Sequence, residues 1–374
     1  MKLKVITVVG TRPEIIRLSR IINKLDFYFN HILVHTGQNY NFELSNIFFK
    51  ELKLKKPKYN LSCKSKSAIE FISKSLVRFD KVLELEKPDA VLVLGDTNSA
   101  LTVLCAKKRK IPIFHIEAGN RCFDESVPEE INRKIIDHIS DINMTYSSYA
   151  SSNLKLEGLH QDRIIKIGSP LYEVYNHYSA QIENSNILKK LNIFEKKFIL
   201  VSVHREENVD FKKNLKSILD AIVQLSKKNN LKVIFSAHPR IEKRIKKFNF
   251  KLDKYINFYK PFGFFDYAKL MKNAKIVLSD SGSITEETSI LSISSVNLRA
   301  SNERQEGMER GISLMSGLKS KDILNAADII LNSKIGELDN KIYHDYELRD
   351  VSKTVVKIIQ SYTHYINKKT WFKL

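Results

Sequence analysis

Three acidic positions stand where alternating strands and helices would gather them. Asp96 follows an apolar run, Glu117 follows another, and Glu129 or Glu130 opens the stretch after Pro128. In an open parallel sheet the carboxyl ends of the strands border one crevice, where ligands bind. Carboxylates gathered there repel one another and lose water, so at least one pKa is displaced toward a working value. The spacing therefore predicts acid–base chemistry.

A second group of residues suits a phosphate. Arg12 lies in a turn between the first strand and the first helix, where free N–H groups and a helix dipole attract anions. His204 and His238 each follow a strand of the second half, and the place of His204 favours contact with a phosphate or action as an acid. An ordinary turn and structural histidines are the alternatives.

The segment from Asp280 to Glu287 opens a helix from a strand end. Ser281, Gly282 and Ser283 are small, so their backbone N–H groups are accessible to a diphosphate. Glu287 stands one helical turn further and suits the hydroxyls of a ribose. Helix capping by Asp280 or Ser281 explains the same pattern.

Composition excludes several classes of protein. The formal net charge of +20 raises the question of nucleic acid, but no aromatic-interleaved basic stripe or RNA-binding signature is present, so we expect no nucleic-acid partner. The positive balance favours an anionic small substrate. Three cysteines without CxxC spacing indicate neither a disulfide framework nor a zinc site. With no signal peptide and no apolar stretch of membrane-spanning length, we expect a cytoplasmic protein without membrane insertion.

The elements that must position these residues form two series. Short apolar runs alternate with amphipathic stretches up to residue 167, and the alternation restarts at Phe198 after a polar segment, 173–196. We therefore predict an α/β protein of two Rossmann-like domains facing across a cleft. The predicted domains are 1–172 with the acid–base cluster, 173–350 with the nucleotide site, and a terminal helix, 351–374, that closes the second domain or crosses back to the first.

Ten motifs in order over nearly the whole chain resemble the non-hydrolysing UDP-N-acetylglucosamine 2-epimerase family, which has a glycosyltransferase-B-like fold. They are Gly10-Thr-Arg-Pro-Glu14, Thr36-Gly-Gln38, Gly95-Asp-Thr97, His115-Ile-Glu-Ala-Gly119, Pro128-Glu-Glu-Ile-Asn-Arg133, His204-Arg-Glu-Glu-Asn208, His238-Pro239, Asp280-Ser-Gly282, Glu286-Glu287 and Glu303-Arg304. Arg304–Met308, Pro261–Tyr267 and the tail resemble the branch that inverts C2 of UDP-2-acetamido-2,6-dideoxy-L-talose to give UDP-N-acetyl-L-fucosamine for surface polysaccharide.

The resemblance implies a mechanism and residue roles. The family eliminates UDP across C1–C2 to leave a 2-acetamidoglycal and re-adds it with the opposite configuration at C2. By resemblance, the acid–base set is Asp96, Glu117 and Glu129, with His204 at the phosphates. The implied UDP-binding residues are Arg12, Arg17, His238, Tyr267, Ser281, Gly282, Ser283, Glu287 and Arg304. Neither a metal nor a nicotinamide cofactor is expected.

Other readings stay open. A UDP-N-acetylglucosamine/UDP-N-acetylmannosamine 2-epimerase, a hydrolysing epimerase and a glycosyltransferase are possible on this fold, since fold alone does not fix function. Ser283 replaces the second glycine of the family's usual Gly-Gly, and Asn39 replaces a usual histidine, which puts activation by a second sugar nucleotide in doubt. We also expect a homodimer through 41–53 and 67–87, which carry Phe48, Phe49, Phe71 and Ile72.

Overall fold

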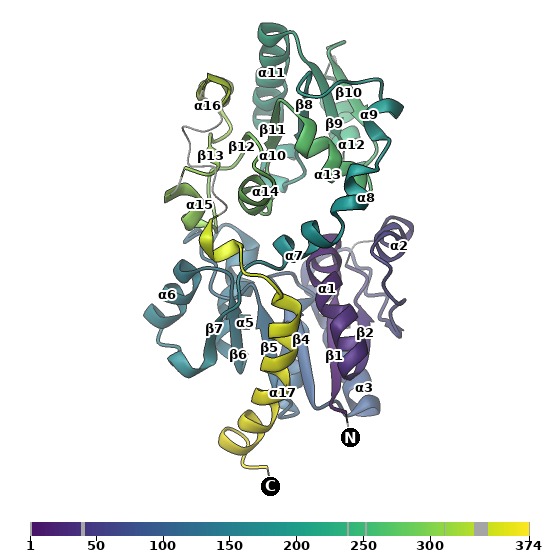
Figure 1. The fold of residues 1–374 in the computed structure, drawn as a ribbon, viewed down its shortest axis with the longest axis vertical. Helices are drawn as coiled ribbons and strands as arrows, with labels where there is room; N and C mark the ends of the chain where they lie inside the picture. The colour runs from purple at the N-terminus through teal and green to yellow at the C-terminus, as the bar shows by residue number, and fades with distance from the viewer. Residues whose placement is uncertain are drawn as a thin grey trace. The chain divides into compact units, whose positions relative to one another are not determined.

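The computed structural model describes residues 2–38, 42–237, 239–250, 253–309, 311–332 and 343–373. The chain divides into two compact units (Figure 1). Unit 1 comprises Met1–His177 and Asp345–Leu374, and unit 2 comprises Tyr178–His344. The predicted fold class, two Rossmann-like α/β domains, is confirmed, because each unit holds one parallel sheet with helical connections.

Unit 1 contains a seven-stranded sheet in the order β3-β2-β1-β4-β5-β6-β7, and every pair is parallel. Its strands are β1 (Lys4–Val9), β2 (Asn30–His35), β3 (Tyr59–Asn60), β4 (Ala90–Leu94), β5 (Ile113–Ile116), β6 (Ile142–Thr145) and β7 (Ile164–Lys166). All five side chains of β4 are apolar and buried, as expected for a strand covered on both faces.

The helices of unit 1 connect these strands. They are α1 (Arg12–Tyr28), α2 (Phe42–Glu51), α3 (Ala68–Glu86), η1 (Ala100–Thr102), α4 (Val103–Lys108), α5 (Pro128–Ile139), α6 (Ser148–Leu156), η2 (Gln161–Arg163), α7 (Pro170–His177) and α17 (Val351–Lys369). The terminal helix α17 packs against α1 and α7 (Figure 1), so its apolar face is buried within unit 1.

Unit 2 contains a six-stranded parallel sheet in the order β10-β9-β8-β11-β12-β13. Its strands are β8 (Phe198–Ser202), β9 (Lys232–Ser236), β10 (Ile256–Tyr259), β11 (Ile276–Ser279), β12 (Ser295–Asn297) and β13 (Leu314–Met315). Its helices are α8 (Ser179–Glu183), α9 (Ile187–Lys190), α10 (Glu206–Val209), α11 (Lys212–Asn229), α12 (Pro239–Lys247), α13 (Phe264–Asn273), α14 (Ile284–Leu291), α15 (Gln305–Glu309) and α16 (Ser320–Asn332). The short η3 (His344–Tyr346) spans the boundary of the units.

Each sheet reverses its strand order at one place, between β1 and β4 in unit 1 and between β8 and β11 in unit 2. The helices that follow the two central strands leave on opposite faces at such a point, and the carboxyl ends there form the usual ligand crevice of an open α/β sheet. The turns after these strands begin at Gly10, Gly95, Val203 and Asp280, so they carry the predicted site motifs.

The residues that suggested a dimer interface have a different role. Phe48, Phe49 and Phe71 are each at most 5% exposed, and Ile72 packs partly buried against the core. They are therefore core residues of unit 1, and the interface argument built on them is wrong. The exposed apolar side chains of α3 are instead Ile69, Val77 and Leu85. Across the described ranges, no helix is both long and apolar enough to cross a membrane.

Candidate active site

Glu117 stands directly after β5 in a left-handed backbone conformation, with φ of +71°. Its carboxylate forms an ion pair with Arg17 of α1, and Tyr146 donates its hydroxyl to the same oxygen at 3.3 Å. The Glu117 side chain is only 13% exposed. Arg17 and Tyr146 therefore fix the position of this carboxylate at the carboxyl end of the sheet.

Asp96 follows β4, the neighbour of β5 in the sheet. Arg133 of α5 holds its carboxylate through two nitrogens, Nε at 2.8 Å and Nη2 at 2.6 Å. Asn132 donates to the backbone carbonyl of Asp96 at 2.9 Å. The side chain of Asp96 remains 23% exposed, so it is fixed in orientation and accessible from solvent. The structure thus places two arginine-bound carboxylates after adjacent strands.

Glu129 and Glu130, which the sequence left as alternatives, differ in surroundings. Glu130 is fully buried, and it accepts hydrogen bonds from the backbone N–H groups of Cys122 and Phe123 and from Arg133. Burial alone would raise the pKa of Glu130, but these donors hold it below its usual range. Glu130 therefore anchors the loop before α5, whereas Glu129 is partly exposed in the first turn of that helix.

The turn that carries Arg12 does not offer the free N–H groups that the sequence suggested. The N–H groups of Gly10 and Thr11 both donate to the buried carboxylate of Glu14 at 2.6 Å. The other Glu14 oxygen accepts the hydroxyl of Thr97 at 2.7 Å, next to Asp96. A Cβ at Gly10 would lie 2.0 Å from Ser99 Oγ, so glycine is required for this close approach. Phosphate binding by these two amides is thus wrong for this turn.

In unit 2, His204 and Asp280 follow β8 and β11, which are neighbours at the reversal of strand order. The His204 ring faces the buried Asp280 carboxylate at 3.0 Å, and Asp280 also accepts the N–H groups of His204 and Arg205 and the amide of Asn208. Burial alone would raise the pKa of Asp280, but the facing His204 and these donors hold it below its usual range. The imidazole is 48% exposed and held in one orientation.

The loop after Asp280 has the predicted small residues. Ser283 precedes α14 in a helical conformation and makes no side-chain capping bond. Ser281 Oγ accepts the N–H of Ser283 at 3.4 Å, so the predicted capping by Ser281 is present. Ser281 and Ser283 share a hydrogen bond of 2.9 Å between their hydroxyls, and Ser283 is 3.1 Å from a carboxylate oxygen of Glu287. Both burial and the nearby Glu287 raise the pKa of Tyr267. The structure therefore brings Ser281, Ser283, Glu287 and Tyr267 together.

Arg304 is more deeply placed than the sequence suggested. It is 1% exposed, and it pairs with Glu286 at 2.6 Å and with Glu303 at 3.4 Å. Arg299 binds the other Glu303 oxygen at 2.5 Å. A Cβ at Gly282 would lie 2.4 Å from Glu303, so this buried network packs directly beneath the loop of small residues.

His238, a predicted UDP contact, lies outside the described residues. Within the described part of the chain, no group of three or more His, Cys, Asp or Glu side chains is arranged to hold a metal ion.

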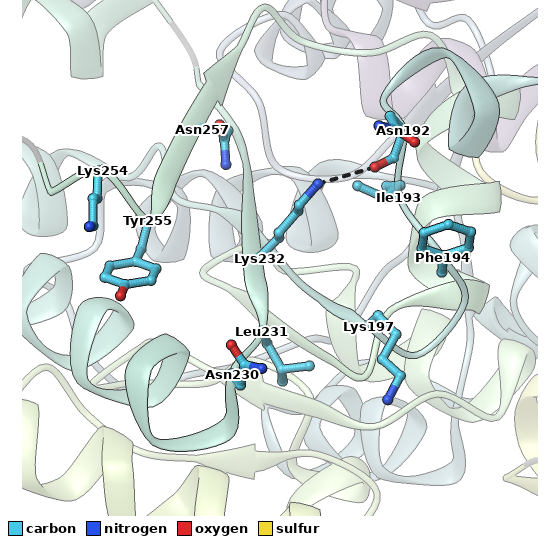
Figure 2. Close-up of a pocket in the computed structure, with 10 residues that line it drawn as sticks. All are labelled: Asn192, Ile193, Phe194, Lys197, Asn230, Leu231, Lys232, Lys254, Tyr255 and Asn257. Carbon is cyan, nitrogen blue, oxygen red and sulfur yellow. Dashed lines mark hydrogen bonds between the residues drawn. The ribbon is translucent and has the colours of Figure 1, made fainter.

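Figure 2 shows a hollow of about 520 Å³ in unit 2. It is lined at the amino ends of β8, β9 and β10 by Asn192, Ile193, Phe194, Lys197, Asn230, Leu231, Lys232, Lys254, Tyr255 and Asn257. Lys232 donates to the carbonyl of Asn192 at 3.2 Å across it. His204 and Ser281 follow the opposite ends of the strands, so this hollow is separate from their group.

Residues 23–360 match the family described as UDP-N-acetylglucosamine 2-epimerase. This chain belongs to that family. A solved UDP-N-acetylglucosamine 2-epimerase from Rickettsia bellii is 46% identical, with all of both chains covered and a TM-score of 0.92. The enzyme from Methanocaldococcus jannaschii, solved in complex with UDP-GlcNAc and UDP, is 37% identical over 96% of this chain and 99% of its own, with a TM-score of 0.89. As a member of the family, the chain is an isomerase, as the sequence predicts.

A third relative acts on a different sugar. The UDP-2,3-diacetamido-2,3-dideoxy-D-glucuronate 2-epimerase of Pseudomonas aeruginosa is 31% identical, covering 91% of this chain and 96% of its own. None of these three names refers to the talose sugar that the sequence motifs suggested as substrate.

Several contacts of the site were not predicted. Arg133 was part of a motif but had no assigned role, although its place three residues after Glu130 puts both on one face of α5. Tyr146 gave no signal, because its partner Glu117 is far away in sequence. Glu14 stood in a motif without an assigned role, although Thr11 and Glu14 have the spacing of a capping box.

Proposed function

We propose that this chain inverts C2 of a UDP-2-acetamido sugar by the non-hydrolysing route, with UDP-N-acetylglucosamine as its substrate. The observation that carries the proposal is the pair Asp96 and Glu117, which follow adjacent strands of unit 1 and are each held by an arginine. The relative from Methanocaldococcus jannaschii solved with UDP-GlcNAc and UDP supports the choice of sugar.

The chemistry requires paired proton-transfer groups. The C2 proton is barely acidic, so its removal is coupled to departure of the anionic diphosphate from C1. One carboxylate accepts the proton. The electron pair of the C2–H bond then forms the C1–C2 double bond of a 2-acetamidoglycal, and UDP leaves from C1. UDP then adds back at C1, and a second group returns a proton to the opposite face of C2. Donors around the diphosphate stabilise the charge that develops on the leaving UDP.

Unit 1 supplies the proton-transfer groups in this proposal. Asp96, Glu117 and Glu129 form the acid–base set. Arg133 and Arg17 pair with Asp96 and Glu117 and hold each carboxylate in one orientation, which suits groups that transfer a proton at a fixed place. The reaction is reversible, so the acceptor in one direction is the donor in the other.

Unit 2 supplies most of the nucleotide contacts. His204 has an exposed ring in a fixed orientation and assists the departing diphosphate. The remaining UDP contacts are assigned by family position to Arg12, Arg17, His238, Tyr267, Ser281, Gly282, Ser283, Glu287 and Arg304. Among these, Glu287 takes the ribose hydroxyls and Tyr267 stacks on uracil. Since Arg304 is buried against Glu286, it contributes mainly by supporting the loop beside Gly282.

A 6-deoxy sugar is the second candidate substrate. Arg304–Met308 and Pro261–Tyr267 resemble the branch that produces UDP-N-acetyl-L-fucosamine. The Pseudomonas aeruginosa relative acts on a diacetamido glucuronate, so members of the family act on sugars that differ from one another at positions other than C2. The named relatives nevertheless favour UDP-N-acetylglucosamine.

One experiment separates these readings. The protein is incubated in D2O with UDP-N-acetylglucosamine, the diacetamido glucuronate or the 6-deoxy-L-talose sugar nucleotide, and C2 is followed by NMR. We expect inversion with deuterium at C2 for UDP-N-acetylglucosamine. Inversion of the talose sugar alone would favour the second candidate, and free UDP without epimer would indicate a hydrolysing enzyme. No exchange with any sugar would overturn the proposal.

We propose the cellular location and the oligomeric state of the enzyme on separate grounds. The cysteines Cys63, Cys105 and Cys122 are free thiols, which suits a reducing cytoplasm. We also propose a homodimer, with the exposed apolar side chains of α3 as its contact.

A further inference from the structure

A buried histidine lies behind both carboxylate-bearing turns of unit 1. His115 is on β5, two residues before Glu117, and is 1% exposed. Its Nε2 lies 3.0 Å from the backbone carbonyl oxygen of Gly95, the residue before Asp96. Its Nδ1 lies 2.9 Å from Oδ1 of Asp137 on α5. In the part of the chain that the structure describes, neither Nδ1 nor Oδ1 makes a hydrogen bond of good geometry, so the two atoms meet as a close polar contact.

The surroundings determine where the protons are. A backbone carbonyl has no proton to give, so Nε2 must donate to Gly95. Burial alone would raise the pKa of Asp137, but His115 and Arg121 hold it below its usual range, so Asp137 is ionised and has no proton to give either. His115 therefore donates through Nε2 to the turn before Asp96 and turns Nδ1 toward Asp137.

Asp137 is also held by a cation. It accepts from Nη1 of Arg121 at 2.7 Å, and Arg121 pairs with Glu157 at 2.6 Å. This pairing offsets the cost of burying the Asp137 carboxylate. The fixed carboxylate in turn limits where the His115 ring can lie.

The same cluster contacts both turns. His115 binds the carbonyl of Gly95, whose φ of +74° turns the chain so that Asp96 faces Arg133. The second oxygen of Asp137 accepts the N–H of Gly119 at 3.2 Å, in the turn that carries Glu117. Arg133 and Asp137 are four residues apart on α5, so one helix face reaches both turns.

We infer that the buried pair His115 and Asp137 positions the two carboxylates Asp96 and Glu117 relative to each other. Neither residue touches the reacting atoms, so both are positioning residues. The inference rests on the proposed roles of Asp96 and Glu117. A misplacement of about 1 Å at a reacting group can cost ~10²-fold in rate, so loss of the pair affects turnover more than nucleotide binding, which lies mainly in unit 2.

The test uses His115→Gln, Asp137→Asn and the double variant in the full chain. We expect kcat and C2 deuterium exchange per folded molecule to fall about 10- to 100-fold, with Kd for UDP changed less than twofold. The double variant should lose no more than the worse single variant, because the two side chains act as one unit. An unchanged kcat in both single variants would overturn the inference.

His31→Gln is the matched control. His31 is also a buried histidine of unit 1 facing a carboxylate, Asp26 at 2.7 Å, but its other ring nitrogen faces Thr7 in the middle of β1. It should lower stability without changing kcat per folded molecule. A fall in kcat equal to that of His115→Gln would mean a general loss of packing and would overturn the inference.

A spectroscopic measurement is independent of activity. In protein with 15N-labelled histidine, the ring whose signals disappear in His115→Gln, or move in Asp137→Asn if that variant alone folds, should show a protonated Nε2, as its bond to the carbonyl of Gly95 requires. An unprotonated Nε2 would overturn the inference. If Nε2 is protonated but Glu117→Gln retains wild-type exchange, the proposed function fails while the positioning contacts stand.

Discussion

Glu117 and Arg17 form a nearly buried ion pair beside Tyr146, and Glu117→Gln removes both the proton-transfer group and the charge that faces Arg17. The amide is close to isosteric and still accepts from Tyr146. It can neither take nor return the C2 proton, so we expect exchange at C2 to fall ~10²–10⁴-fold. UDP binding should be nearly intact, because its proposed contacts lie mainly in unit 2. Deuterium exchange and UDP titration measure the two effects.

Glu86→Gln is the matched control for this change. Glu86 is the last residue of α3, and its side chain is 9% exposed. It pairs with Lys58 and lies close to Lys4, at the amino end of β1. It should leave exchange at C2 unchanged. Wild-type exchange in Glu117→Gln would contradict the acid–base assignment.

Glu14 should make stability depend on pH. Burial raises its pKa from 4.5 to about 7, despite four hydrogen-bond donors from Gly10, Thr11 and Thr97. Between these values the unfolded chain loses the proton while the folded chain keeps it, so the free energy of unfolding falls as pH rises. This loss in the free energy of unfolding reaches about 3 kcal/mol above pH 7 and is absent below pH 4.5.

Glu14→Gln removes that titration. The difference in unfolding free energy, wild type minus variant, should fall by about 3 kcal/mol from pH 4 to pH 8 in denaturant titrations. In Glu86→Gln the sign should reverse, because the hydrogen bond from Lys58 holds the pKa of Glu86 below its usual range. A flat difference for Glu14→Gln would show that Glu14 ionises normally.

At the scale of elements, the buried carboxylate of Asp280 ties the end of β11 to the turn after β8. Asp280→Asn replaces one acceptor oxygen with a donor, which leaves a buried N–H of His204 or Arg205 unpaired. We expect a loss of about 1–3 kcal/mol in stability. Amide hydrogen exchange at residues 204 and 205 should become faster, and UDP binding should weaken.

Asp210→Asn provides the control within the same unit. Asp210 pairs with Arg240 and Arg244 and is 23% exposed, so its loss should cost no more than about 1 kcal/mol. Exchange at residue 204 should stay as in the wild type. Equal effects of the two variants would argue against a special role for Asp280.

At the scale of the whole molecule, UDP should stabilise the protein by mass action. A ligand that binds only the folded state adds about 2.7 kcal/mol at 100 times its Kd. Differential scanning calorimetry with millimolar UDP should therefore show a higher Tm, and ADP at the same concentration should show a smaller change. An unchanged Tm with UDP would count heavily against the nucleotide site.

Assembly is a separate prediction for the whole molecule. Light scattering should give twice the 43.3 kDa mass of one chain. Ile69 and Val77 are 75% and 57% exposed on α3, so replacing both with lysine should give the monomer if this helix forms the contact. A wild-type monomer at working concentration would end the dimer proposal.

Sequence by itself determined the fold class and the series of strands, because apolar runs such as 90–94 and amphipathic helices have periods that are local in the chain. It also located Asp96, Glu117, His204 and the loop at Ser281 at strand ends, since the order of elements fixes which residues follow strands. The two-residue strands β3 and β13 were missed, because two residues show no period.

Only the tertiary structure decided which polar groups meet. Glu14 and Thr97 are 83 residues apart, and Arg17 and Glu117 are 100 apart, so no local pattern pairs them. A local capping box placed Glu14 on the amides that the sequence assigned to a phosphate. Tertiary packing buried Arg304 against Glu286. It also enclosed His115 between a carbonyl and a carboxylate. Hydrogen-bond partners depend on distance in space, and the sequence records only distance along the chain.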